Sequence, residues 1–443
     1  MTSWATQIDS GDVAWLLIMT VLPMVFTTAG FALVLTSRFQ GNGVDDIWGR
    51  LPVLVASLLI AWGLWIYSLA FGPSWGTVPK VDPYEIQPML SLQEIMEIED
   101  AKIDETDSFG RGGLIGGLDY VGMNEVFPVA KTNGPHFPSR RPNTHVPHVL
   151  ECLFRWTGLL LAIVPLWIVW SQRFRGIWLG LIGVLWSSFV FAPIAHWVWG
   201  DGWLEKLGTI DFGGGLLVMA VAFSGLKWNL GVPDSIPCNF DLSARQGLGT
   251  MLLWLGASLF VSAQTFHADG RAALALLNVL IGTSAGILVW SVCNGFIWKV
   301  HGLHSIGVGV IVCVAGMASS AGVVLPQSAI VIGAFIGFLA NVWFHLGLKS
   351  RDATRSLCFS TLGMAAAGGL LSAGVFATTS VAVRRWDGRP VIGLMEGEPL
   401  QLLHQAVGVC SVGAWVFVVS WLLYCVVERC QTLASGRASP PTR

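Results

Sequence analysis

The polar residues with the clearest chemical potential lie in residues 192–224, where a short turn separates two apolar runs. His196 and Trp199 close the first run, and the face of the Trp199 indole can attract a cation. Asp211 opens the second run through three glycines. A carboxylate at the start of an apolar helix is costly in lipid, so it should face the protein interior or a cavity. It could equally cap the helix by accepting bonds from the free N–H groups of the first turn, and the two interpretations are compatible.

Other polar patterns do not predict catalysis, a metal site or nucleic-acid binding. The eight cysteines are scattered and lack metal spacing, so we interpret them as small core residues. His345 and His404 lie on otherwise apolar helices, which favours hydrogen-bonded core histidines over ligands. Residues 110–117 are rich in glycine but do not join a strand to a helix, which argues against a phosphate loop. We therefore predict no enzyme activity, no metal and no cofactor.

The composition is that of an integral membrane protein. Of 443 residues, 53% are hydrophobic and only 12% are charged, and the mean hydropathy is +0.65. Soluble domains carry about 25% charged residues. The 22 tryptophans and 52 glycines fit interfacial anchors and close helix packing.

Eleven apolar runs are long enough to span a bilayer. They begin near Val13, Leu51, His148, Ile177, Asp211, Leu248, Ala272, Ser305, Ala329, Leu357 and Leu400. The sequence thus predicts an all-α polytopic membrane protein whose ends lie on opposite sides. No basic region precedes the first run, so we expect it to remain as a helix and not to be cleaved as a signal.

The orientation follows from the basic residues of the short loops, which fall in alternate loops on one side. The positive-inside rule makes that side cytoplasmic, with the N-terminus outside and the C-terminus inside. Residues 381–399, with three arginines, are the exception and are predicted to lie outside. The cytoplasmic set is Arg38, Arg50, Arg173, Arg175, Lys227, Arg245, Lys299, Lys349, Arg351, Arg355, Arg429, Arg437 and Arg443.

We divide the chain into a transmembrane domain, residues 1–430, and a short cytoplasmic tail, residues 431–443. The domain contains one long extracytoplasmic loop, residues 72–147, whose first half is acidic at about residues 82–107. That insertion could form a short amphipathic helix or a solvated, variable loop. The end of the tail is rich in Ser, Pro and Arg, and we expect it to be disordered.

Two phrases carry a family resemblance. Residues 193–200 read Pro-Ile-Ala-His-Trp-Val-Trp-Gly, and residues 211–215 read Asp-Phe-Gly-Gly-Gly. In these residue types, their order and their spacing, the chain resembles the ammonium transporter/Rhesus family. Shorter matching phrases lie at residues 10–15, 67–72 and 116–122, so the likeness covers about residues 10–427, apart from the acidic insertion.

The resemblance implies ten helices in two inverted five-helix halves, with an eleventh helix that crosses them. It also implies a homotrimer in the cell membrane with one pore per subunit. The residues themselves give weaker support, because the fifth and tenth runs are both rich in small residues. Corresponding segments of this kind are typical of inverted-repeat transporters, although generic tight packing would also explain them.

The family carries two hydrogen-bonded histidines in the middle of its pore, one on the fifth and one on the tenth helix. The matching positions here are Met219 and Leu362. A thioether is a weak acceptor and a leucine side chain has no polar atom, so neither can relay a proton.

At the pore entrance the resemblance implies a partly retained site. The family's gate is a pair of stacked phenylalanines, for which the matching positions are Phe154 and Gly158. Trp199 keeps the cation-recruiting wall, and Gln264 stands where the family has a hydroxyl partner. Asp211 would support this site structurally without touching the ion.

The resulting hypothesis is a membrane protein that moves ammonium or ammonia, electroneutrally or with impaired transport because the histidine positions are Met219 and Leu362. Two alternatives stay open: a non-conducting relative that senses ammonium or has a structural role, and a channel for another small neutral solute. The expected partners are ammonium or ammonia, the lipid bilayer and two further copies of the chain, with no nucleic acid.

Overall fold

The computed structural model describes nine stretches of the chain: residues 8–36, 43–75, 112–131, 134–140, 145–226, 244–299, 304–349, 354–381 and 391–435. The predicted acidic insertion, residues 82–107, lies outside the described residues, as do residues 436–443 of the predicted tail.

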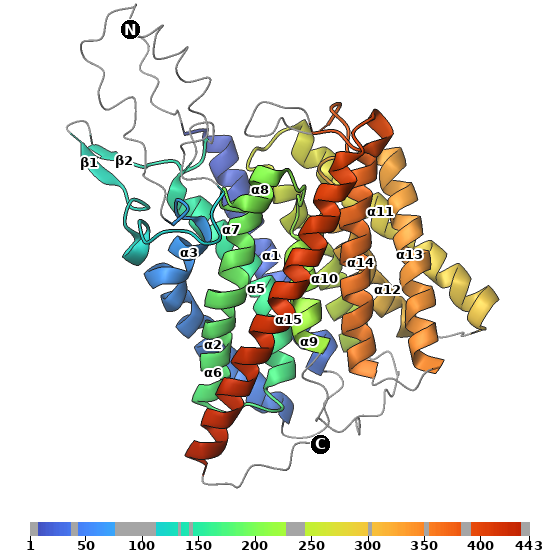
Figure 1. Ribbon diagram of the computed structural model, residues 1–443, viewed down its shortest axis with the longest axis horizontal. Coiled ribbons are helices and arrows are strands. Elements are labelled where there is room, and N and C mark those ends of the chain that lie inside the picture. Colours follow the sequence, from blue (N-terminus) through green and yellow to red (C-terminus); the bar gives the residue numbers. More distant parts are fainter. Residues whose placement is uncertain are drawn as a thin grey trace, which may run out of the picture.

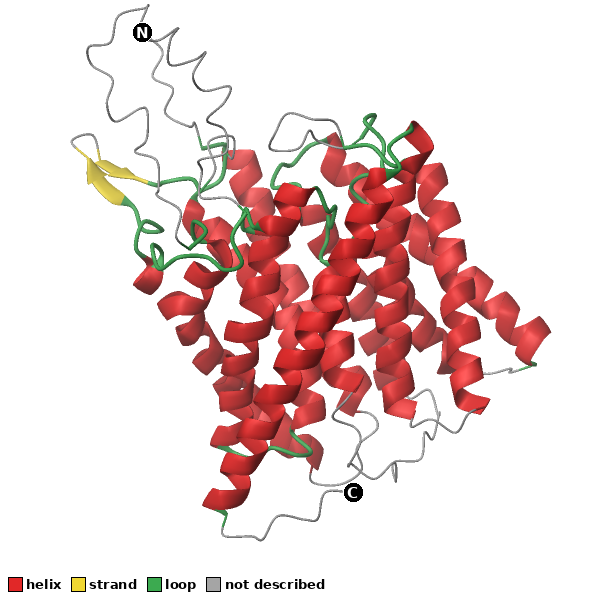
Figure 2. Ribbon diagram, in the orientation of Figure 1, coloured by secondary structure: helices red, strands yellow, loops and turns green. Residues whose placement is uncertain are grey.

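The prediction of an all-α polytopic membrane protein with eleven membrane helices is confirmed. Helices form the whole bundle, and the two short strands lie outside it (Figure 2). Within the described residues, nine helices are long and apolar enough to cross a membrane, and Gly215–Gly225 and Ile306–Ala318 form two shorter apolar helices. These eleven segments coincide with the eleven apolar runs of the sequence. Length and apolar composition locate them because a bilayer leaves no water for the backbone groups of a spanning segment.

The first half of the chain supplies five of these segments. They are α1 (Ser10–Thr36); α2 (Gly43–Ala61), continued by a π-helical turn (Trp62–Ile66) and α3 (Tyr67–Phe71); α5 (His148–Trp170); α6 (Ile177–Trp186), continued by a π-helical turn (Ser187–Phe191) and α7 (Ala192–Trp199); and α9 (Gly215–Leu226).

The second half supplies five more and is followed by the long last helix. They are α10 (Ala244–Ala263), α11 (Gly270–Cys293) with a π-helical turn (Asn294–Trp298), α12 (His304–Ala318), α13 (Pro326–Lys349) and α14 (Thr354–Phe376), and the last helix is α15 (Leu400–Ala434).

Counterpart helices of the two halves pack against each other. The first of each half, α1 and α10, lie side by side, and so do the last of each half, α9 and α14. Close approach depends on glycine: a Cβ on Gly369 of α14 would overlap the carbonyl oxygen of Gly316 in α12. Small residues let helix backbones approach in this way in a membrane.

Helix α15 runs obliquely across the bundle (Figure 1) and packs on α6, α9 and α14. Its Gln405 accepts a bond from the backbone N–H of Ile210, at 2.8 Å, and donates to the carbonyl oxygens of Ile210 and Leu370. At its far end Glu428 pairs with Arg173. The helix continues to Ala434, so the first residues of the predicted tail are helical.

Short elements cover one end of the bundle, which we call the hairpin side. The antiparallel strands β1 (Val129–Lys131) and β2 (Gly134–His136) project there, and α8 (Trp203–Leu207) follows α7 on the same side (Figure 1). In the part of the chain that the structure describes, the other short elements are 3-10 turns at Val121–Met123 and Leu394–Glu396.

Candidate functional site

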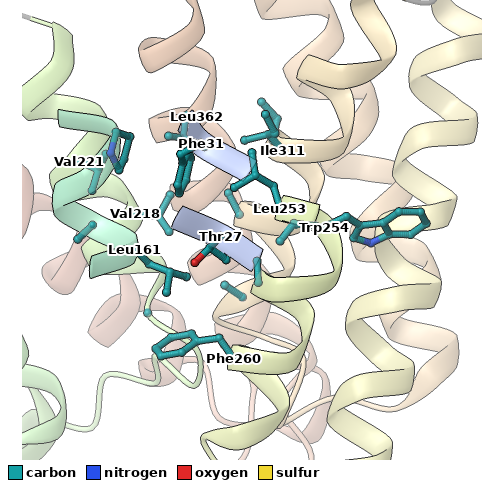
Figure 3. Close-up of a pocket in the computed structure, with 18 of the residues that line it drawn as sticks. Thr27, Phe31, Leu161, Val218, Val221, Leu253, Trp254, Phe260, Ile311 and Leu362 are labelled. Carbon is teal, nitrogen blue, oxygen red and sulfur yellow. The ribbon is translucent and has the colours of Figure 1, made fainter. Parts of the chain in front are cut away.

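A cavity of about 210 Å³ lies between helices of both halves (Figure 3). Residues of α1, α5, α7, α9, α10, α12 and α14 line it, mostly with apolar side chains such as Phe31, Leu161 and Leu253. The lining follows α10 from Gln246 to Phe260, which corresponds to about 20 Å at the rise of an α-helix. The cavity is therefore long enough to cross much of a bilayer core.

The wall of the cavity has few groups that could bind an ion or relay a proton. Among the described residues that line it, none is a histidine and none carries a charge. The hydroxyl of Thr27 is engaged by its own helix, because it donates to the carbonyl oxygen of Pro23 at 2.5 Å. A solute inside would meet mainly methyl and ring groups.

The two positions matched to pore histidines differ in placement. Leu362 lines the cavity, as expected for a pore residue. Met219 is only 1% exposed, belongs to the buried core and is not among the lining residues. Its neighbour Val218 lines the cavity instead, since one step along an α-helix turns a side chain by about 100°. We therefore place Met219 behind the cavity wall and not in it.

Asp211 is a helix cap and is also buried, so both interpretations of this residue hold. Its carboxylate accepts bonds from the N–H groups of Gly214, Gly215 and Leu216 at 2.7–3.0 Å. Ser319, which follows α12, donates to the same carboxylate at 2.9 Å. These donors satisfy the buried charge, and Asp211 is absent from the cavity lining. Gly214 has a φ of 91°, a left-handed conformation that favours glycine.

A stacked phenylalanine pair closes the hairpin-side end of the cavity, but its second member comes from another helix. Phe154 of α5 stacks on Phe260 of α10 with ring centroids 5.2 Å apart. The expected position Gly158 faces the same ring, because a Cβ there would lie 3.1 Å from Phe260. Glycine at 158 thus makes room for Phe260, and a phenylalanine side chain there would overlap it.

Beyond this stack lies a side chain that the sequence analysis did not consider. The guanidinium of Arg155 lies 4.9 Å from the ring centroid of Trp199, 5.1 Å from Phe71 and 4.8 Å from Phe266. Distances below about 6 Å are those of cation–aromatic attraction. We call the three rings the aromatic cage. Trp199 does face a cation, as expected, but that cation belongs to the protein.

Polar partners hold Arg155 in the cage. Its Nη1 donates to Oε1 of Gln264 at 3.0 Å. Its Nε lies 3.7 Å from Oε1 of Glu151, one helical turn earlier. The side chain of Arg155 is only 7% exposed. The side-chain oxygen of Gln264 therefore accepts a hydrogen bond from Arg155 and helps to hold it in place.

A second arginine completes a buried charge network. Arg140 donates from Nε to Glu151 at 3.0 Å and from Nη1 to Asp201 at 3.3 Å, and its Nη2 donates to the carbonyl oxygen of Trp199 at 3.0 Å. Burial disfavours the charged form of Arg140, but the charges of Glu151 and Asp201 outweigh this effect and raise its pKa. The network fixes the end of α7, and with it the indole of Trp199.

The histidines on these helices have structural partners. His345 lies 2.8 Å from Oδ1 of Asn294 and stacks on Trp298, which confirms its interpretation as a bonded core residue. His196 contacts the hydroxyl of Ser74 through Nε2 at 3.0 Å. Within the described part of the chain, no three His, Cys, Asp or Glu side chains converge as metal ligands would.

Comparisons with known proteins agree with the fold and with the sequence phrases. A family model described as Ammonium Transporter Family matches residues 142–436. An ammonium transporter of Bacillus subtilis is 30% identical over 328 residues, covering 71% of this chain and 76% of that protein. Ammonium transporter Amt1 of Archaeoglobus fulgidus is 29% identical over 346 residues, covering 72% and 78%. The crystal structure of Saccharomyces cerevisiae Mep2 matches with a TM-score of 0.74 at 23% identity, over 95% of this chain and 86% of that one, and supports the fold.

Proposed function

The chain belongs to the ammonium transporter family, and from the chemistry of its cavity we propose that it passes ammonia across the membrane as the neutral molecule. The observation that carries this proposal is the uncharged wall, in which Leu362 and Val218 lie where a proton relay would be needed. Transport of the ammonium ion itself would require acceptors along the path.

Ammonium and ammonia differ greatly in the free energy needed to move them out of water. Moving an ion of ammonium size out of water costs several kcal/mol even after the protein relaxes, unless polar groups replace the lost water. Ammonia carries no net charge and has far less hydration to lose. An apolar passage therefore favours the neutral form, and the proton stays behind on the side of entry.

The test separates flux from charge movement. Protein in liposomes containing a pH dye is exposed to an ammonium gradient, and internal alkalinisation is compared with that of empty liposomes of the same lipid. We expect faster alkalinisation with protein and no ammonium-driven current on a supported membrane. A robust current from the unaltered protein would contradict the proposal.

The matched control narrows the cavity and leaves the residues of the aromatic cage unchanged. Leu161 lines the cavity in α5, so Leu161→Trp should return the rate to that of empty liposomes. A folded Leu161→Trp variant that still alkalinises at the unaltered rate would show that ammonia does not pass through this cavity.

We further propose that the hairpin side faces out of the cell, that the end of α15 faces the cytoplasm, and that three copies assemble in the cell membrane. The basic residues of the short loops support the orientation, and membership of the family supports the trimer. A cysteine at Glu99, in the acidic insertion, should react with an impermeant reagent in intact cells. Light scattering of the purified protein should give three times the chain mass of 47.7 kDa after subtraction of detergent.

A further inference from the structure

We propose that Arg155 sets the charge selectivity of the entrance: its guanidinium occupies the aromatic cage as a tethered cation and keeps external cations out. This inference deepens the proposed function, since it names the residue that would exclude ammonium while neutral ammonia passes. It concerns the entrance and not the cavity wall, so the two proposals can fail separately.

The geometry of the cage supports occupancy by the protein itself. Three aromatic rings surround one guanidinium carbon at 4.8–5.1 Å. A ring face that already holds one cation offers little to a second, because the two like charges would repel each other in a site with little water. The cage already contains the guanidinium of Arg155, and the second cation near its Phe71 ring, Arg140 at 5.6 Å, also belongs to the protein.

The position of the cage decides what Arg155 can control. Trp199 belongs both to the cage and to the lining of the cavity. Phe266 belongs to the cage and packs edge-on against Phe154, at 5.3 Å, which in turn stacks on the cavity residue Phe260. Arg155 therefore lies next to the end of the cavity, and a solute entering there passes beside a fixed positive charge. An arginine beside a narrow path is a known means of excluding cations from a pore.

The network behind Arg155 keeps it in place. Gln264 accepts from its Nη1, and Glu151 lies between the two guanidinium groups of Arg155 and Arg140. Arginine stays charged throughout the physiological pH range. The barrier should therefore not relax with pH between about 5 and 9, unlike one built on histidine.

The direct test measures ammonium binding to the purified full-length protein, without transport. Thermal unfolding is followed while ammonium chloride replaces N-methylglucamine chloride at constant ionic strength, because a ligand that binds the folded state raises the unfolding temperature. We expect no ammonium-dependent shift for the unaltered protein. The unfolding temperature of Arg155→Ala should rise with ammonium concentration and then saturate. This result would give an affinity for ammonium at least about tenfold above that of the unaltered protein, and tenfold corresponds to about 1.4 kcal/mol.

Three further measurements distinguish charge from shape. Arg155→Lys keeps a cation in the cage and should still show no ammonium shift. Millimolar guanidinium added to Arg155→Ala should occupy the vacated cage and abolish the ammonium shift. Arg173→Ala removes an arginine that pairs with Glu428 at the far end of α15, and it should behave like the unaltered protein.

The outcomes are decisive in each direction. A folded Arg155→Ala protein without an ammonium shift would overturn the inference, as would a shift in the unaltered protein. If Arg155→Ala does not fold, Arg155→Gln, which can still bond Gln264, takes its place with the same expectation. A gain of binding in Arg155→Ala, found together with no ammonia flux in the unaltered protein, would support the inference while contradicting the proposed function.

Discussion

The entrance and the cavity wall of this protein differ in almost every physical respect, although they share Trp199. The entrance contains two buried arginines, a buried glutamate and an aromatic cage. The wall behind it carries no charge along about 20 Å of α10 and is mostly apolar there, with Gln246 and Thr250 as the polar side chains on that helix. The comparison teaches that selection by charge and the cost of losing hydration are set in different places. The entrance excludes cations, whereas the wall sets the free energy that a solute spends on losing its water. The predictions below test whether this separation holds.

The largest effect is expected at the carboxylate shared by the two arginines. Glu151→Ala would leave two buried guanidinium groups without it, so we expect a loss of about 3–5 kcal/mol of unfolding free energy, the usual cost of breaking a buried ion pair. Thermal and denaturant unfolding of the purified protein measure this loss. Glu205→Ala removes a carboxylate that accepts a bond from the backbone N–H of Asp201, in a partly buried position. This change should cost far less. Equal losses would show that Glu151 has no special role.

A histidine in the wall should disturb stability less and should not create a current. Leu362→His places an imidazole among apolar groups, at a cost of about 1–3 kcal/mol for a poorly paired polar group. While Arg155 remains in the cage, we expect no ammonium current on a supported membrane. A current from Leu362→His with Arg155 intact would show that the wall, and not the entrance, decides charge selectivity.

The residue shared by both regions should have an intermediate effect. Trp199→Leu removes one face of the cage, at a cost of about 1–2 kcal/mol of unfolding free energy, and leaves ammonium binding unchanged because that face holds Arg155. Trp203→Leu, in α8, is the matched tryptophan control outside the cage. If the unaltered protein binds ammonium and Trp199→Leu abolishes this binding, the cage is open to external cations.

The smallest effect is expected away from both regions, at the cap of α11. Asp269 accepts bonds from the N–H groups of Arg271 and Ala272. Burial opposes its ionisation, but these bonds and the charge of Arg271 lower its pKa overall. A lowered carboxyl pKa gives stability that is present at neutral pH and is lost as the pH falls below about 4. Asp269→Ala should cost about 1 kcal/mol at pH 7 and progressively less in acid, as measured by unfolding at several pH values. A pH-independent difference would contradict the role of the charge.

The sequence located the helices well because lipid imposes a simple rule of length and apolarity. The eleven starting points, from Val13 to Leu400, all fall within or beside the observed segments. The role of Asp211 was also foreseen, since a cap depends on residues within one turn.

The site was harder to predict because its contacts join distant parts of the chain. Nothing in the spacing of α5 points to Phe260, which lies more than a hundred residues beyond Phe154. The residue types alone also do not show that Val218, and not Met219, faces the cavity. Arg155 could have been found: Glu151 and Arg155 are charges one turn apart in an apolar run, and such charges inside a membrane segment indicate a functional site.

The bond from Ser319 to Asp211 has a mechanical consequence. Ser319 follows α12 in the second half, and Asp211 precedes α9 in the first. Many transporters built from inverted repeats work by alternating access, in which one half rocks against the other around the substrate. Here such rocking would break a buried hydrogen bond to a carboxylate that also caps α9, and bonds of this charged kind are about twice as strong as neutral ones. This hydrogen bond thus links the two halves near the entrance. The link favours a channel whose halves keep their relative positions over a transporter that works by alternating access.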